Sequence, residues 1–172
     1  ELHFEINKWL VLLLGQNVDS YKWSPNSELK GKAQIEKTDE VNVVNFAELL
    51  EMTAQVSPYL LIRFSTSHPK DITDEVLHVI AKYENICKHV HLPVQSGSNR
   101  ILKLMNRKHT IEEYLKVYEK LKKINSNIEF SSDFIIGYPE ENDDDFMHTI
   151  KLIKKIRFIN SYSFIFSPRP GT

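Results

Sequence analysis

Short apolar runs alternate along the chain with longer stretches in which apolar residues recur every three or four positions. The short runs are bounded by polar residues, Pro or Gly, which is typical of β-strands. They predict five strands, at 9–14, 60–65, 89–94, 128–136 and 161–166. Because strand and helix alternate throughout, the pattern predicts an α/β protein with a parallel sheet and right-handed crossovers.

The stretches between the strands predict amphipathic helices over 44–54 and 71–83, and from 110 and 143 onward. Two of them begin with residues suited to a capping box, Asn45 with Glu48 and Thr110 with Glu113. Three aspartates, 143 to 145, open the last helix, where they favour the helix dipole. The side chains expected on the buried helix faces are Ala47, Leu50, Ile72, Val76, Ile80, Tyr83, Ile111, Leu115, Tyr118, Leu121, Phe146, Ile150 and Ile153.

Composition adds a few limits. The 172 residues are 41% apolar, enough for one sizeable core, and the net charge of −1 does not favour nucleic acid by itself. No apolar run is long enough to span a membrane. Cys87 is the one cysteine, which excludes a disulfide framework and is compatible with a reducing cytoplasm; a buried inert thiol is expected. Residues 22–42 are predicted to form a loop.

The segment 91–98, His-Leu-Pro-Val-Gln-Ser-Gly-Ser, carries the strongest functional signal. It predicts a strand that runs into a polar turn, with a basic amphipathic helix after it, and α/β folds place ligands at such edges. Gly97 is expected to permit a sharp turn and Ser98 to cap the helix. Arg107 beyond that helix offers a positive charge for a carboxylate or a phosphate.

This segment resembles the radical-SAM methylthiotransferases, and within them the tRNA-modifying MiaB type. Three other segments agree in the same order, at 14–21 (LGQNVDSY), 64–70 (FSTSHPK) and 166–172 (FSPRPGT). Methylthiotransferases that act on a ribosomal protein carry a different signature at the position of 94–98. The run Val-Gln-Ser-Gly-Ser therefore favours the tRNA branch.

The resemblance implies a partial (β/α) barrel of the TIM-like radical-SAM type, with about five of six parallel strands. Family members hold a 4Fe–4S cluster with three cysteines in the pattern C-x₃-C-x₂-C, whereas this chain has Cys87 alone. We therefore expect residues 1–172 to be a piece of a longer enzyme. It would lack the first strand with its cluster loop, the amino-terminal domain and the carboxy-terminal RNA-binding domain, and would be inactive alone.

The resemblance also implies S-adenosylmethionine (SAM) as cofactor. Gln95 and Asp133 end neighbouring predicted strands, and an amide with a carboxylate suits a ribose diol, while Arg107 suits the SAM carboxylate. The same three positions have these parts in related radical-SAM enzymes. The further cofactor-binding candidates are Gln16, Thr66, Ser67, Ser96 and Gly137.

Two local features qualify this picture. The family's adenine-binding segment resembles 135–141, but Glu140 stands where a glycine usually follows the proline. His68, His89 and His91 do not have metal-ligand spacing, so core or strand-end histidines are expected.

The family reaction places a methylthio group on carbon 2 of an isopentenylated adenosine beside the anticodon, one SAM giving the methyl group and another the radical. The implied partner is the tRNA anticodon stem-loop, in the cytoplasm. Basic residues between 100 and 123 suit RNA, or merely balance the acidic run 140–145. Three alternatives remain: a non-catalytic SAM- or nucleotide-binding module, an RNA-interaction remnant, and a methylthiotransferase of another substrate branch.

Overall fold

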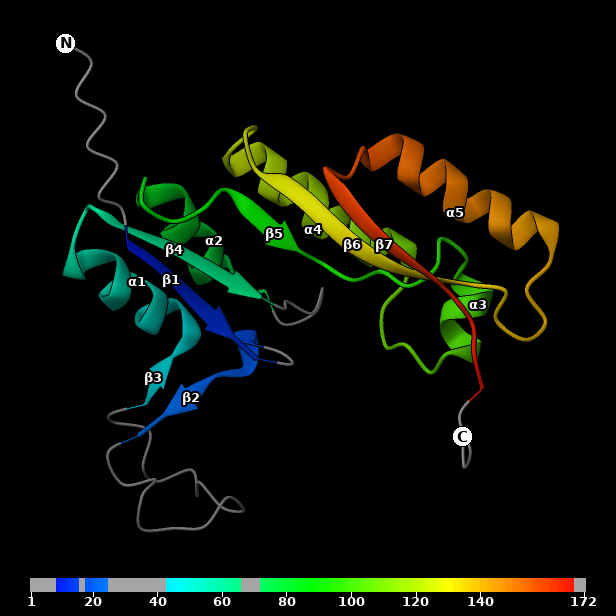
Figure 1. Ribbon diagram of the computed structural model, residues 1–172, viewed down its shortest axis with the longest axis horizontal. Coiled ribbons are helices and arrows are strands. Elements are labelled where there is room, and N and C mark those ends of the chain that lie inside the picture. The colour runs from blue at the N-terminus through cyan, green and yellow to red at the C-terminus, as the bar shows by residue number, and fades with distance from the viewer. Residues whose placement is uncertain (1–8, 16–17, 25–42, 66–71, 169–172) are drawn as a thin grey trace. The chain divides into compact units, whose positions relative to one another are not determined.

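The computed structural model describes residues 9–15, 18–24, 43–65 and 72–168 (Figure 1). The chain forms two compact units. One comprises 1–65 with 73–87, and the other comprises 66–72 with 88–172. No helix in the described ranges is long and apolar enough to cross a membrane.

The described part of the first unit contains one parallel pair of strands. Strand β1 (Trp9–Leu14) pairs with β4 (Leu60–Ser65), and Ile62 also forms a bridge with Ile86. The other elements are η1 (Val18–Ser20), the short antiparallel pair β2 (Lys22–Trp23) and β3 (Val44–Asn45), and the helices α1 (Phe46–Val56) and α2 (Asp74–Lys82). The prediction of a loop over 22–42 was therefore wrong at its start, because Lys22 and Trp23 pair with Asn45 and Val44.

Capping side chains set where these helices begin. The predicted capping box of α1 is confirmed: the Asn45 N–H donates to Glu48 Oε2 (2.8 Å) and the Glu48 N–H to Asn45 Oδ1 (2.9 Å). Helix α2 begins at Asp74, three residues later than predicted, because the Thr73 hydroxyl caps it by accepting from the Val76 N–H.

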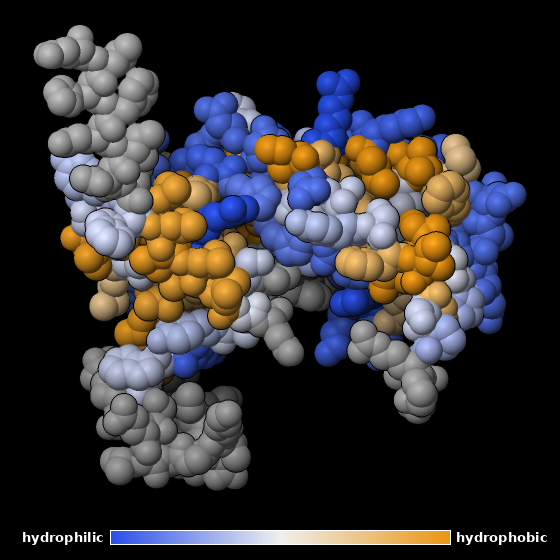
Figure 2. Space-filling view, in the orientation of Figure 1, coloured by the Kyte–Doolittle hydropathy of each residue, from blue (hydrophilic) through white to orange (hydrophobic). Residues whose placement is uncertain are grey.

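Strand β1 leaves much of its apolar surface in contact with solvent. Its exposed side chains are Trp9, Leu10, Leu12 and Leu14. Figure 2 shows a broad apolar area over this part of the chain. In the described residues the one strand that pairs with β1 is β4.

In its described residues the second unit is built on three parallel strands, β5 (His89–His91), β6 (Glu129–Ile136) and β7 (Asn160–Ile165), in that order. Its helices are α3 (Asn99–Leu104), α4 (Ile111–Ile124) and α5 (Asp143–Ile156). The five predicted strands are thus all present and pair in parallel within their units.

Strand β5 is shorter than predicted because an extra residue interrupts its ladder with β6. The Leu92 N–H donates to Ser131 O, but the next expected donor, the Val94 N–H, donates to Ser132 Oγ instead (3.0 Å). Gln95 then resumes the pairing by donating to Asp133 O (2.9 Å). One additional residue on one strand is a bulge, and Pro93 is tolerated there.

The buried face of α5 differs from the prediction. Phe146 is 38% exposed and Ile150 and Ile153 are only partly buried, whereas Asp145 and Thr149 are buried. The apolar periodicity therefore predicted the wrong buried face. It could not indicate that these two polar side chains form hydrogen bonds with Gly97 and Ser98, in the turn before α3.

Helix α4 is confirmed in position, with the predicted capping box between Thr110 and Glu113. Leu121 is buried as predicted, but Tyr114 is the other fully buried side chain, and its hydroxyl donates to Leu92 O (2.8 Å). Ile111, Leu115 and Tyr118 are only partly buried.

Candidate functional site

The bulge after β5 holds Gln95 in an unusual conformation. Its φ is +76°, in the left-handed region that non-glycine residues rarely occupy. Both backbone groups are paired with β6, since its N–H donates to Asp133 O and its carbonyl accepts from the Ile135 N–H, each at 2.9 Å. Gln95 is 8% exposed, yet no hydrogen bond joins its side-chain amide to another described residue. A strained, nearly buried and unbonded amide is typical of a binding site.

Asp133 lies beside Gln95 because of this pairing. Its carboxylate is 29% exposed, and Oδ2 lies 3.3 Å from His91 Nε2. The structure therefore joins the backbones of Gln95 and Asp133 on adjacent strands, but Asp133 lies within β6 and not at its end as predicted. Together they offer an amide and a carboxylate, which suit the donors and acceptors of a diol.

Arg107 is not joined to this pair. It follows α3, where its N–H donates to Leu102 O (2.8 Å), and it is exposed. Among the described residues no hydrogen bond or ion pair connects its guanidinium with Gln95 or Asp133. Gln16, Thr66 and Ser67 lie outside the described residues.

The two serines of the turn stabilise local structure. Ser96 is fully buried and its Oγ accepts from the Ser98 N–H (3.2 Å). Ser98 caps α3 as predicted, accepting from the Ile101 N–H, and its hydroxyl donates to Asp145 Oδ1 (2.6 Å). A fully buried Ser96 fits a turn residue, so its role as a ligand contact stays a prediction.

Gly97 is required for a reason other than the predicted sharp turn. Positive φ occurs at Gln95, not at Gly97. A Cβ on Gly97 would lie 2.4 Å from Thr149 Cα and 2.5 Å from Thr149 N. The Gly97 N–H also donates to Thr149 Oγ1 (2.8 Å), so the glycine lets the turn lie directly on the backbone of α5.

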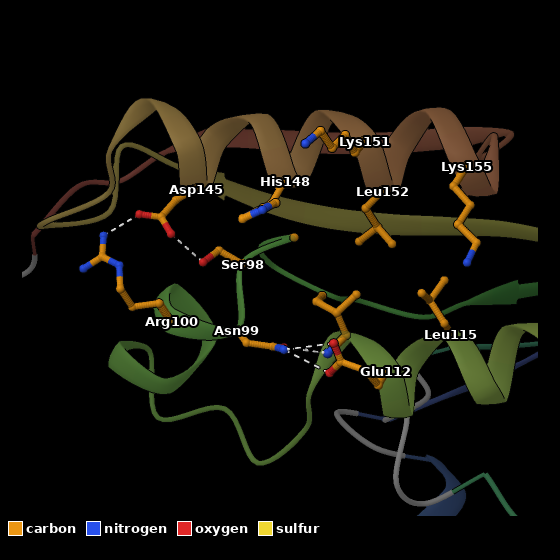
Figure 3. A pocket seen from close by; sticks show the side chains of 12 residues that line it. Ser98, Asn99, Arg100, Glu112, Leu115, Asp145, His148, Lys151, Leu152 and Lys155 are labelled. Carbon is orange, nitrogen blue, oxygen red and sulfur yellow. Dashed lines mark hydrogen bonds and ion pairs between the residues drawn. The ribbon is translucent and has the colours of Figure 1, made fainter.

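Asp145 links this turn with α3 and with the loop before α5. Its carboxylate forms an ion pair with Arg100 Nη2 and accepts from Ser98, as Figure 3 shows. The hydrogen bond from Arg100 and then that from Ser98 lower the pKa of Asp145 to about 2. Arg100 also donates to Glu140 O (2.5 Å), so its charge is engaged within the protein rather than in an open basic face.

A cavity of about 500 Å³ lies beside this network, between α4 and α5 (Figure 3). Leu115 and Leu152 give it an apolar lining, while His148, Lys151 and Lys155 of α5 add polar groups. Of the predicted cofactor-binding residues that the structure describes, none lines it. The cavity is thus separate from the Gln95–Asp133 pair.

Two residues in the loop after β6 have the left-handed backbone conformation that glycine favours. Gly137 has φ +72°, and no atom lies within 4 Å of the position that a Cβ would take there. Its N–H donates to Glu141 Oε2. Glu140 has φ +69°, so the residue that replaces the family's glycine still takes the left-handed conformation. This position is strained by about 1–2 kcal/mol relative to glycine.

The sequence did not indicate a role for His91. It was expected as a core or strand-end residue, yet its ring joins Ser131 Oγ (2.8 Å, from Nδ1) with the carboxylate of Asp133. Strand alternation was the signal that could have indicated this contact. Ser131 and Asp133 are two residues apart on β6 and so share a face, and His91 is opposite Ser131.

The described residues do not fit a 4Fe–4S cluster. They contain no group of three His, Cys, Asp or Glu side chains that could hold a metal ion, and Cys87 is the only cysteine of the sequence. Its half-buried thiol cannot supply three thiolates.

Curated relatives match nearly the whole chain. The tRNA-2-methylthio-N(6)-dimethylallyladenosine synthase of Pelagibacter ubique is 54% identical over 162 residues, and that of Amoebophilus asiaticus is 53% identical over 163 residues. Each alignment covers 94% of this chain but 33% of the relative. The chain therefore spans about a third of the length of these relatives.

Solved structures show a similar fold. Coproporphyrinogen III oxidase from Escherichia coli, a radical SAM enzyme, has a TM-score of 0.58 at 17% identity, over 74% of this chain and 30% of that one. SuiB of Streptococcus suis, in its SAM-bound structure, has a TM-score of 0.57 at 12% identity, over 94% of this chain and 30% of that one. The radical SAM superfamily model matches residues 10–153, and the chain therefore belongs to the radical SAM superfamily.

Proposed function

We propose that this chain forms the SAM-binding part of a tRNA methylthiotransferase. The observation that carries the proposal is the identity of 54% over 94% of the chain with a tRNA-2-methylthio-N(6)-dimethylallyladenosine synthase. The reaction would add a methylthio group to carbon 2 of an isopentenylated adenosine beside the anticodon. When bound, SAM supplies the methyl group and the radical chemistry of this reaction, while the protein positions it.

Gln95 and Asp133 would hold the ribose of SAM. The Gln95 amide is nearly buried and unbonded among the described residues, and the Asp133 carboxylate remains partly exposed. A ribose diol donates to a carboxylate and accepts from an amide, so the pair matches both requirements. Gly137 would let the adenine approach the open backbone after β6. Gln16, Thr66, Ser67 and Ser96 stay candidates for the remaining contacts.

Arg107 would bind the carboxylate of SAM. Its exposed guanidinium is accessible to a ligand, and a bidentate contact is the geometry that arginine favours. Arg107→Ala should lower SAM affinity about tenfold or more, because a hydrogen bond to a charged group contributes about 1.5–3 kcal/mol. Arg107→Lys should recover part of the loss, since a point charge does not reproduce the planar fork.

The test is calorimetric titration of SAM into the full-length protein. Asp133→Asn should weaken binding about tenfold, whereas Asp143→Asn, an exposed carboxylate in the first turn of α5, should leave it unchanged. Wild-type protein that binds no SAM would contradict the proposal. Equal effects of Asp133→Asn and Asp143→Asn would contradict the site.

The proposed macromolecular partner is the anticodon stem-loop of a tRNA, and the proposed location is the cytoplasm. Lys103 and Lys108 flank Arg107 and are exposed, which suits contact with phosphates. Replacing both lysines with glutamine should weaken tRNA binding and reduce its dependence on salt. A binding curve unchanged by these substitutions would exclude this surface.

A further inference from the structure

His91 connects two side chains of β6 on one face of the sheet. Its Nδ1 lies 2.8 Å from Ser131 Oγ, and its Nε2 lies 3.3 Å from Asp133 Oδ2. His91 is directly opposite Ser131 in the parallel pairing, and Asp133 follows two residues later. Strand geometry therefore places all three side chains in one row.

The partners of the imidazole match one of its two neutral tautomers. A carboxylate cannot donate, so an Nε2 that carries the proton faces a matching acceptor, Asp133 Oδ2, at 3.3 Å. In that tautomer Nδ1 is left to accept from the Ser131 hydroxyl at 2.8 Å. Ser131 is 4% exposed and the His91 side chain 15%, so the ring is held from both sides in a nearly closed environment.

This arrangement restricts the Asp133 carboxylate. One of its oxygens is engaged by His91, while the 29% exposed side chain keeps surface for a ligand. The backbone of Asp133 is held as well, because its carbonyl accepts from Gln95. A carboxylate that is oriented before binding loses less side-chain entropy when a ligand arrives.

The row is not suited to hydrolysis of a Ser-His-Asp type. A nucleophilic serine has to reach its substrate, but Ser131 lies in the middle of β6 with 4% of its surface exposed. Its hydroxyl serves instead to fix the ring.

We propose that His91 is a positioning residue, which orients the Asp133 carboxylate toward the ribose hydroxyls of the adenosyl ligand. This inference rests on the proposed function, since it requires Asp133 to bind that ribose. It assigns to His91 an effect on affinity that acts only through Asp133.

The experiment uses two probes, S-adenosylhomocysteine and its 2′,3′-dideoxy analogue, titrated by calorimetry into the full-length protein. His91→Ala should weaken binding of S-adenosylhomocysteine about three- to tenfold, the effect of one net hydrogen bond. It should leave binding of the dideoxy analogue unchanged, because that ligand has no ribose hydroxyls for Asp133.

Conservative variants separate the two contacts of the ring. His91→Gln should recover most of the affinity, since its amide nitrogen reaches about as far as Nε2 and can donate to Asp133. His91→Asn should not, because its amide reaches only the position of Nδ1. His148→Ala, on the exposed side of α5, is the matched control and should bind as wild type does.

Four outcomes would overturn the inference. Unchanged affinity of His91→Ala for S-adenosylhomocysteine would exclude the positioning role. Equal losses for both probes, or no recovery in His91→Gln, would assign His91 to general folding. Wild-type protein that does not bind S-adenosylhomocysteine would overturn the proposed function, and this inference with it.

Discussion

Gly97→Ala should destabilise the protein strongly, because the new methyl group would meet backbone atoms. Its Cβ would lie 2.4 Å from Thr149 Cα and 2.6 Å from His148 C. Non-bonded carbons normally stay about 3.5–4.0 Å apart, so the turn and α5 would have to separate by about 1 Å. These are backbone atoms of α5, which cannot rotate away from the new methyl group as a flexible side chain can.

The magnitude follows from two effects. Overpacking of a dense interior lowers the free energy of unfolding by about 1–3 kcal/mol. Separation would also break the buried hydrogen bond from the Gly97 N–H to Thr149 Oγ1, which adds about 1 kcal/mol. We therefore expect a loss of about 2–4 kcal/mol in the free energy of unfolding, a large part of the stability of a typical domain.

Urea unfolding followed by far-UV circular dichroism measures this loss in the full-length protein. Gly137→Ala is the matched control: φ is +72° there, but no atom lies within 4 Å of the added Cβ. It should lose only about 1–2 kcal/mol through backbone strain. Thr149→Ser should not rescue Gly97→Ala, since the collision involves the main chain. A loss for Gly97→Ala no larger than about 1 kcal/mol would refute this reasoning.

Three further changes test other parts of the structure. The pKa of Asp145 is about 2 in the folded protein against 3.8 ordinarily, so its ion pair stabilises the fold above pH 3.8 and this contribution is lost as the pH falls toward 2. The difference in urea midpoint between wild type and Asp145→Asn should therefore shrink over that interval; a constant difference would contradict the ion pair. Glu140→Gly should be more stable than Glu140→Ala by about 1 kcal/mol in thermal unfolding, because φ is +69° there; equal stabilities would show that the strain is absent. Anaerobic reconstitution of this 172-residue chain should yield no stoichiometric 4Fe–4S cluster, because Cys87 is the one cysteine; iron and sulfide analysis checks this, and full uptake would contradict it.

Local signals in the sequence predicted much of the fold. The five apolar runs became the five parallel strands, and the residue pairs Asn45–Glu48 and Thr110–Glu113 formed their capping boxes. These features depend on neighbours within a few positions, so a linear pattern contains the information. The pairing of Gln95 with Asp133 was predictable only in part: adjacent parallel strands were expected to bring them close, but Asp133 lies within β6 and not at its carboxyl end.

Features that depend on distant partners were missed. The buried face of α5 was predicted wrongly, since Asp145 is buried only because Arg100 and Ser98 bind it. The bulge at Gln95 depends on Ser132, which is 38 positions from Val94 and accepts from its N–H. The need for Gly97 depends on Thr149 in the same way. Hydropathy does not encode such pairings, because they join polar groups.

The two polar residues on the buried face of α5, Asp145 and Thr149, also fix the position of the helix along its own axis. An apolar face can slide by a turn, about 5.4 Å, and still find apolar neighbours. Asp145 and Thr149 have directional partners in Ser98 and the Gly97 N–H, and a slide would leave buried polar groups unpaired. The helix therefore has a single register against the turn 95–98. Because Gly97 and Ser98 are bonded to α5, this register also fixes the position of Gln95 at the start of the turn.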